Sequence, residues 1–237
     1  MKWLFNRNKS NLKYYPTTQD IGAILEKYIG KNNVHTIFDI GAHHGKFALS
    51  IIGLFPKATV YAFEPYKNSF DVLVKNTKDK KIIPLSLAVC NYEGNATLNI
   101  NSFEETNSLL DSSITGNNVI DNLTKSISQA IIETTTIDAI IENYKIKNID
   151  LLKLDIQGSE LSALQGAENL LSNQRVAFIL AEVEFIEIYK NQPLYHNVAD
   201  FLVTKGYSLY SIYNIHYDIN DRISWADAVF ISSTIKL

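Results

Sequence analysis

The stretch of sequence that decides the fold is T-I-F-D-I-G-A-H-H-G, residues Thr36 to Gly45. Its first residues are β-branched or aromatic, which favours a buried strand that ends near Asp39. Gly41 and Gly45 then bracket a tight turn, because glycine takes positive φ without strain and lets a ligand approach the backbone closely. The pattern predicts a strand, a turn and a helix N-terminus that meet at one point.

The segments that follow extend this unit. A helix is expected over residues 46–54, and an apolar strand over residues 59–63 ends in Glu64-Pro65. An acid at the tip of the second strand is placed to bind the ribose hydroxyls of a nucleotide. We therefore expect a nucleotide-binding βαβ unit.

Charge and glycine spacing select the nucleotide. The spacing here is G-x-x-x-G, whereas a dinucleotide fold places its pyrophosphate on G-x-G-x-x-G. Asp39, two residues before Gly41, would repel a pyrophosphate and attract a ligand with ammonium and sulfonium charges. S-adenosylmethionine (SAM) carries both charges, and its ribose diol suits Glu64. The turn is interpreted as a SAM site, with a plain structural turn as the alternative.

Composition narrows the class of protein. The chain has 237 residues, of which 46% are hydrophobic and 20% charged, enough for one sizeable domain with a full core. The net charge of −3 gives no general attraction for nucleic acid. One cysteine, no secretory signal and no run of about 18 apolar residues lead us to expect a cytoplasmic protein of unknown oligomeric state. Lys2, Arg7, Lys9 and Lys13 make the N-terminus basic, which allows a weak peripheral membrane contact.

Strands and helices alternate along the chain. Further helices are expected over residues 19–28, 65–76, 137–144, 159–171 and 198–205, and further strands over 82–89, 96–100, 149–155, 176–183, 207–213 and 226–232. This alternation predicts an α/β fold in which helices cover both faces of a parallel sheet. The last two strands have no helix between them, which predicts an antiparallel final strand.

One segment interrupts the alternation of strands and helices. Residues 101–133 are rich in Ser, Asn and Thr, and a segment this long between regular elements is either a functional lid or poorly ordered. We expect a lid-like insertion with some helix of its own. It lies within an expected domain over residues 34–237, which follows an N-terminal extension with one helix over residues 1–33.

Acids lie at the ends of two strongly apolar expected strands, over residues 149–155 and 176–183. Asp155 ends one strand and Glu160 lies in the first turn of the next helix, so both are expected beside the nucleotide pocket. Either side chain suits a general base, a hydroxyl-orienting group or a divalent-metal ligand. Glu182 and Glu184 alternate at the end of the following strand and are expected to face the same cleft. The alternatives are helix-dipole complementation for Glu160 and plain solvated acids for the pair.

Two histidines lie inside the glycine turn. His43 suits a positive φ, since histidine is enriched there among non-glycine residues. His44 is a further candidate base, because imidazole titrates near neutral pH. A purely local role for both is the alternative.

Seven pieces of the sequence add up to a family pattern. They are F-D-I-G-A-H-H-G, Y-A-F-E-P, L-A-V-C-N-Y-E-G-N-A-T-L, T-N-S-L-L, E-T-T-T-I-D-A-I-I, L-L-K-L-D-I-Q-G-S-E-L-S-A-L-Q-G-A and A-E-V-E-F. Over about residues 34 to 232 the chain resembles the FkbM-type SAM-dependent methyltransferases. The resemblance implies a class I methyltransferase (Rossmann-like) fold, with a seven-stranded, mostly parallel sheet. It also implies methyl transfer to hydroxyl oxygens, with macrolides and sugars among the acceptors.

The resemblance also implies roles for individual residues. Asp39, Gly41 and Gly45 would hold the methionine end of SAM, Glu64 would bind the ribose, and Ala88 and Val89 would line the adenine. His43, where family members more often carry Asn, and Asp155, beside the transferred methyl, are also expected to bind the cofactor. From the residues themselves, the expected catalytic residues are Asp155, Glu160 and His44, and the expected ligands of any metal are Asp155, Glu160 and Glu182. The expected substrate residues are Asn107, Ser108, Gln157, Glu182 and Glu184.

The expected activity is O-methyl transfer to a small molecule or glycan, with a sugar hydroxyl favoured. An acceptor oxygen must sit about 3 Å from the sulfonium methyl, and a base that takes its proton contributes about 10²–10⁴-fold. The candidate bases are Asp155, Glu160 and His44, in that order, and a bound divalent metal that lowers the hydroxyl pKa is an alternative. A SAM-fold binding module without chemistry and an NAD-dependent oxidoreductase remain the other classes.

Overall fold

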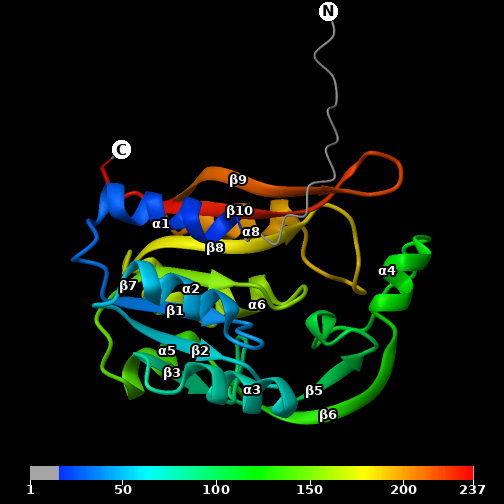
Figure 1. Cartoon of the computed structure of the whole chain (residues 1–237). Helices are drawn as coiled ribbons and strands as arrows, with labels where there is room; N and C mark the ends of the chain where they lie inside the picture. The colour runs from blue at the N-terminus through cyan, green and yellow to red at the C-terminus, as the bar shows by residue number, and fades with distance from the viewer. Residues whose placement is uncertain (1–15, 237) are drawn as a thin grey trace, which may run out of the picture.

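The computed structural model describes residues 16–236, which form two sheets with helices packed around the larger one (Figure 1). In spatial order the strands of the larger sheet are β3 (Ile82–Leu85), β2 (Thr59–Phe63), β1 (Thr36–Ile40), β7 (Ile149–Leu154), β8 (Val176–Glu184), β10 (Ile223–Ser232) and β9 (Tyr207–Tyr217). Strands β1, β2, β3, β7 and β8 are parallel, and β10 is antiparallel to both of its neighbours. The predicted fold class, with its reversed final strand, is confirmed.

Helices cover both faces of this sheet. One face carries α1 (Pro16–Tyr28), α2 (Lys46–Leu54) and α3 (Lys67–Thr77), and the other carries α5 (Ile137–Asn143), α6 (Glu160–Gln165), α7 (Glu168–Ser172) and α8 (Tyr195–Thr204). Strand side chains alternate between the faces, so Leu151 packs with the first set and Leu152 with the second. Ile21 and Leu25 of α1 are fully buried in the first core, so α1 packs into the main fold although we placed it in an N-terminal extension.

A smaller sheet stands beside the carboxyl ends of the main strands. Its strands, in spatial order, are β4 (Ala88–Val89), β6 (Ser126–Thr135) and β5 (Gly94–Asn101). Between β5 and β6 the chain forms the short helices η1 (Glu104–Thr106) and α4 (Asn118–Leu123). The segment over residues 101–133 therefore contains helix, as expected, but it also contains the first part of β6, which we did not predict.

Two expected elements are divided. The strand predicted over residues 82–89 splits into β3 of the large sheet and β4 of the small one, and β3, with Pro84, is the edge strand where proline is tolerated. The helix predicted over residues 159–171 splits into α6 and α7 at Gly166. A Cβ there would lie 2.1 Å from the Cys90 carbonyl oxygen, so the close approach of that loop requires glycine.

Within residues 16–236, none of the helices combines the length and apolarity that crossing a bilayer requires. The basic residues for which we predicted a membrane contact, Lys2, Arg7, Lys9 and Lys13, lie outside the described residues.

Candidate functional site

The turn after β1 is fixed by its contacts with the neighbouring strands. The N–H groups of Gly41 and Ala42 both donate to the Phe63 carbonyl at the end of β2, at 3.1 and 2.9 Å. Gly41 has φ +81°, and a Cβ there would lie 1.9 Å from the Asp155 carbonyl oxygen. Only glycine fits this close approach, so the turn holds the ends of β1, β2 and β7 together.

Glu64 fixes the same turn from the end of β2. Its Oε2 accepts the His43 N–H at 2.9 Å, and its Oε1 accepts the Tyr66 N–H at 2.8 Å. Only 7% of the residue is exposed. Burial raises the pKa of Glu64 to about 7, although both backbone hydrogen bonds oppose the rise.

The charge of Asp39 is balanced inside the protein. Lys153 Nζ lies 3.1 Å from Asp39 Oδ1 and 3.3 Å from Asp155 Oδ2, and it donates to the Gly41 carbonyl at 3.3 Å. Burial raises the pKa of Asp39 and lowers that of Lys153, but attraction to Asp155 and Asp39 outweighs burial and raises the Lys153 pKa overall. Asp39 is fully buried, so it acts on the site through Lys153, while Asp155 presents the exposed carboxylate.

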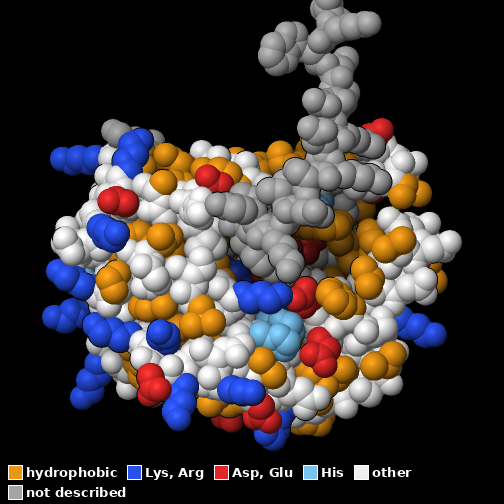
Figure 2. Space-filling view, in the orientation of Figure 1, with side chains coloured by type: hydrophobic (Ala, Val, Ile, Leu, Met, Phe, Trp, Pro, Cys, Tyr) orange, Lys and Arg blue, Asp and Glu red, His pale blue; other side chains and the backbone are white. Residues whose placement is uncertain are grey.

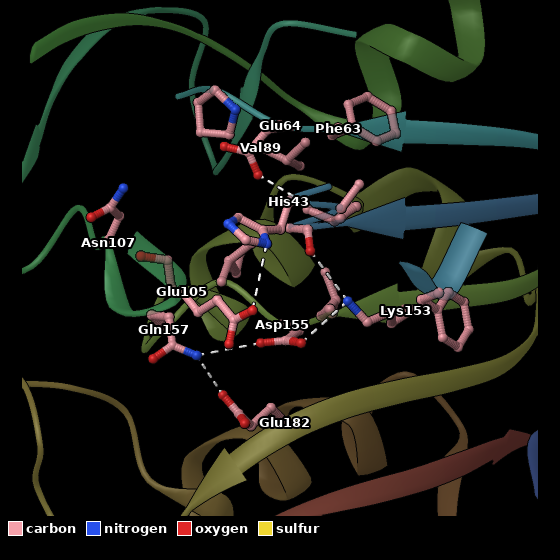
Figure 3. A pocket seen from close by; sticks show the side chains of 18 of the residues that line it. His43, Phe63, Glu64, Val89, Glu105, Asn107, Lys153, Asp155, Gln157 and Glu182 are labelled. Atoms are coloured by element: carbon pink, nitrogen blue, oxygen red, sulfur yellow. Dashed lines mark hydrogen bonds and ion pairs between the residues drawn. The ribbon is translucent and has the colours of Figure 1, made fainter. Parts of the chain in front are cut away.

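These groups surround a cavity of about 330 Å³ (Figure 3), which is within the range of small-molecule sites. One end, the donor end, combines the glycine turn and Glu64 with an apolar wall of Phe63, Leu87, Ala88, Val89 and Leu98. The other end, the acceptor end, is polar and is lined by Asp155, Gln157, Glu182, Asn214 and Asp227.

Gln157 organises the acceptor end. Its Nε2 donates to Glu182 Oε2 at 2.7 Å and to Asp155 Oδ1 at 3.3 Å (Figure 3). Its Oε1 accepts from the Tyr189 hydroxyl at 3.0 Å. Its backbone has φ +54°, outside the usual range for a residue with a side chain. Burial raises the pKa of Glu182 well above its ordinary value, and the charge of Asp155 adds to the rise.

Most of the site residues expected from sequence line this cavity. They are Gly41, His43, His44, Glu64, Ala88, Val89, Asn107, Ser108, Asp155, Gln157 and Glu182. Ser108 is also a structural link, since its Oγ donates to the Gln157 carbonyl at 2.7 Å and so joins the insertion to the turn after β7.

Asp39, Gly45, Glu160 and Glu184 are not among the lining residues. Glu160 is only 2% exposed and its Oε1 accepts the Ile156 N–H at 2.8 Å, so it supports the turn after β7 from beneath. Burial raises the pKa of Glu160 to about 7. Glu184 is also only 2% exposed, so neither Glu160 nor Glu184 faces the cavity as we expected.

The expected metal ligands do not gather. Among the described residues, the acids and histidines whose ligand atoms lie within 4.8 Å of one another are His43, His44 and Glu104. The set that we predicted, Asp155, Glu160 and Glu182, does not converge in this way, because Gln157 separates two of them and Glu160 faces the backbone.

Sequence reasoning missed Lys153, Asn214 and Asp227. Lys153 carried a signal: it stands alone in an apolar strand two residues before Asp155, on the same side of that strand as the acid. Asn214 and Asp227 carried none, because they come from β9 and β10, where Asn214 Nδ2 donates to Asp227 Oδ2 at 2.6 Å. Only the tertiary structure brings them to the cavity.

Comparisons with known proteins agree with this architecture. A sequence profile described as the methyltransferase FkbM domain matches residues 39–209. The chain is 28% identical over 167 residues to the hexuronic acid methyltransferase AglP of Haloferax volcanii, an alignment that covers 70% of this chain and 62% of AglP. It is 24% identical over 227 residues to methyltransferase sdnD of Sordaria araneosa, covering 84% of this chain and 80% of sdnD.

A solved structure supports the fold alone. Magnesium protoporphyrin IX methyltransferase from Synechocystis PCC 6803, determined with bound SAM, matches 92% of this chain and 79% of its own with a TM-score of 0.51 and 11% identity. The strand order, and the cavity at the carboxyl ends of the strands, are those of a class I methyltransferase fold. More particularly, since the profile match spans most of its length, the chain belongs to the FkbM methyltransferase family. It spans less than two thirds of the length of AglP.

Proposed function

We propose that this protein is a SAM-dependent O-methyltransferase that acts on a hydroxyl group of a small molecule or glycan, with a sugar hydroxyl favoured. One observation carries the proposal. The cavity joins an end that suits an adenosyl group to an end where the exposed carboxylate of Asp155 stands among hydrogen-bonding side chains.

The residues at the donor end fit SAM in three places. Glu64, at the tip of β2, suits the ribose hydroxyls, and the apolar wall that includes Val89 suits the adenine. The turn from Gly41 to His44 presents backbone to the methionine end, next to Asp155. When bound there, SAM supplies an electrophilic methyl group on its sulfonium.

Asp155 is the proposed general base. An alcohol is a poor nucleophile until its proton leaves, and a carboxylate within hydrogen-bond reach accepts that proton. Lys153 on one side and Gln157 on the other hold the two carboxylate oxygens of Asp155 in place. The hydroxyl proton would pass to the carboxylate, and the acceptor oxygen would bond to the methyl carbon as the carbon–sulfur bond breaks, with the demethylated cofactor as the leaving group.

The acceptor end supports a hydroxyl-rich substrate. Glu182, Asp227, Gln157 and Asn214 offer several donors and acceptors within one wall of the cavity. Similarity to a hexuronic acid methyltransferase adds support for a sugar.

The test is a transfer assay with radiolabelled SAM and a panel of neutral sugars, uronic acids and lipid-linked glycans, with amine-containing analogues as the comparison. We expect label in an ether-type O-methyl product from at least one sugar. Label on nitrogen would overturn O-transfer. SAM binding with no transfer to any acceptor would favour a binding module.

A further inference from the structure

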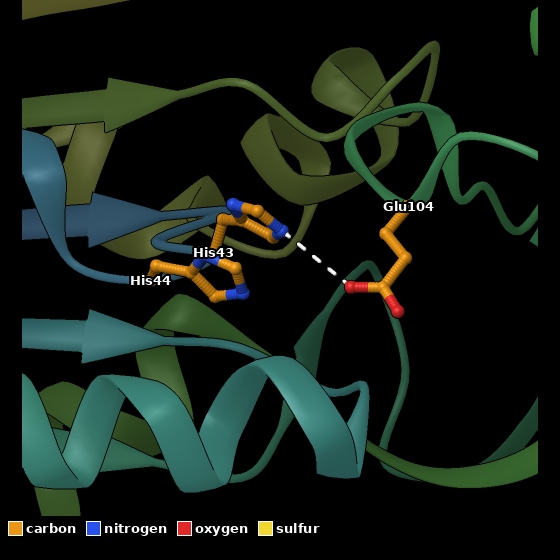
Figure 4. Close-up of side chains that lie close together, drawn as sticks. All are labelled: His43, His44 and Glu104. Carbon is orange, nitrogen blue, oxygen red and sulfur yellow. Dashed lines mark ion pairs between the residues drawn. The ribbon is translucent and has the colours of Figure 1, made fainter.

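Two histidines and an acid meet at the mouth of the donor end, from segments far apart in the sequence. His43 and His44 belong to the turn after β1, and Glu104 belongs to η1 of the insertion. Figure 4 shows the two rings lying one over the other with Glu104 reaching toward them from the opposite segment. The ring centroids are 3.7 Å apart, and one ligand atom from each residue lies within 4.8 Å of the other two.

We propose that His43, His44 and Glu104 bind one divalent ion of the late first-row transition series, best represented by Zn²⁺, which ties the insertion to the cofactor turn. Two imidazoles and one carboxylate are donors that such ions prefer. Ligands about 2.1 Å from a tetrahedral ion are about 3.4 Å apart, so the ligand atoms, now within 4.8 Å of one another, have to move closer together when the ion binds.

The backbone of both histidines is already held. The His43 N–H donates to Glu64 at 2.9 Å, and the His44 carbonyl accepts from Asn76 Nδ2 at 3.0 Å. The backbone at both positions is therefore in place before the ion binds, and only the side chains have to adjust.

The surroundings of His43 complete the pattern of a metal ligand. Its Nε2 is buried, has no hydrogen-bond partner and lies 4.0 Å from Glu104 Oε2. On the other side of the ring, Nδ1 lies 3.7 Å from Glu105 Oε1, and Lys46 Nζ lies 3.4 Å from the same oxygen. Metal-ligating histidines commonly direct their second ring nitrogen to a carboxylate, and Glu105 is placed for that role.

Electrostatics favour the ligand form of the ring. Burial lowers the pKa of His43, and the neighbouring His44 and Lys46 lower it further, while Glu105 and Glu104 oppose them. A neutral imidazole at neutral pH has a lone pair to offer a metal. A ligating His44 cannot also take the acceptor's proton, which is consistent with Asp155 as the base.

The site is reachable from solvent. Figure 2 shows histidine side chains at the surface of this face, flanked by Lys or Arg and by Asp or Glu side chains. The proposed metal site is structural, not catalytic. A bound ion would fix η1 against the turn after β1 and close one side of the cavity.

The test is a calorimetric titration of chelator-stripped full-length protein with Zn²⁺, without cofactor or acceptor, so its result is independent of methyl transfer. We expect one ion per chain, and at least about tenfold weaker binding for His44→Ala and for Glu104→Gln. His196→Ala and Glu133→Gln, which alter exposed residues outside the cluster, are the matched controls and should bind like wild type. Co²⁺ absorption bands typical of tetrahedral coordination should appear in wild type and fade in the two site variants.

The absence of stoichiometric Zn²⁺ binding would overturn the proposal. So would wild-type affinity in both His44→Ala and Glu104→Gln, since the ion would then be bound elsewhere. Thermal unfolding of the metal-free variants separates a lost ligand from a lost fold, and Glu104, which is exposed, is the safer position for that comparison.

Discussion

The two ends of the cavity are built differently. At the donor end, side chains and turns are held by backbone hydrogen bonds, as where both oxygens of Glu64 accept N–H groups. At the acceptor end, side chains hold one another across long sequence separations. Gln157 links to Glu182 and Tyr189, and Asn214 links to Asp227.

The difference shows which end of the cavity depends on the fold and which depends on the identity of individual side chains. Backbone contacts depend on the path of the chain, so the donor end follows from the fold. Side-chain contacts depend on the identity of each partner, so a few substitutions can reshape the acceptor end and leave the donor end intact. We therefore expect substitutions at the two ends to separate donor binding from turnover.

The largest effect is expected at Asp155. Asp155→Asn keeps the shape of the side chain and removes the base, so turnover should fall by about 10²–10⁴-fold while SAM affinity changes little. Asp71→Asn, which alters an exposed acid on α3, is the control. Steady-state kinetics and calorimetry on the same samples measure both quantities. Near wild-type turnover in Asp155→Asn would remove Asp155 as the base.

The next largest effect is a loss of folding stability when Lys153 is replaced. Lys153→Met leaves Asp39 fully buried without its ionic partner, and breaking a buried pair in this way costs about 3–5 kcal/mol of unfolding free energy. The double variant Asp39→Asn with Lys153→Met removes both charges and should recover much of that loss. Urea denaturation of the three proteins measures the effect. A single variant within about 1 kcal/mol of wild type would show that the pair is not important for stability.

The positions of the main strands and the donor end could be predicted because both depend on local patterns. Apolar β-branched runs mark β1, β2, β7 and β8, and the glycine turn with Glu64 marks the pocket between them. Asp39 was identified, but its partner was not, because the sequence alone does not show that a lysine in β7 lies beside it. The direct SAM contact expected of Asp39 stays a prediction. In the structure Asp39 is fully buried, and its ionic partner Lys153, not Asp39 itself, lines the cavity.

The remaining errors have one physical origin. The division of the helix at Gly166 and the placement of Asp227 both depend on contacts between segments distant in sequence. The insertion contains part of β6 because that strand pairs with β5, and a run rich in Ser and Thr does not reveal such a partner.

A smaller effect is expected for the dependence of the free energy of unfolding on pH. Glu160 has an ordinary pKa of 4.5 and a pKa of about 7 in the folded protein because it is buried. The folded state therefore keeps this proton longer than the unfolded state, and the stabilisation present below about pH 4.5 is lost as the pH rises toward about 7, by up to about 3 kcal/mol. Glu64 acts in the same direction.

Glu160→Gln removes this titration, so its unfolding free energy should depend less on pH between about 5 and 8 than that of wild type. Denaturant unfolding at several pH values measures the two slopes, and equal slopes would contradict the shifted pKa. Glu133→Gln, at an exposed position, is the control and should follow wild type.

The most direct test of the account is a calorimetric titration of the purified protein with SAM and with its demethylated product. We predict binding of one ligand per chain. Glu64→Gln should weaken it about 10- to 100-fold, because the variant loses the carboxylate proposed to bind the ribose and one acceptor for the N–H groups of the turn. Glu26→Gln, on the exposed side of α1, should leave binding unchanged. No binding of either ligand to the folded protein would contradict the assignment of the donor end.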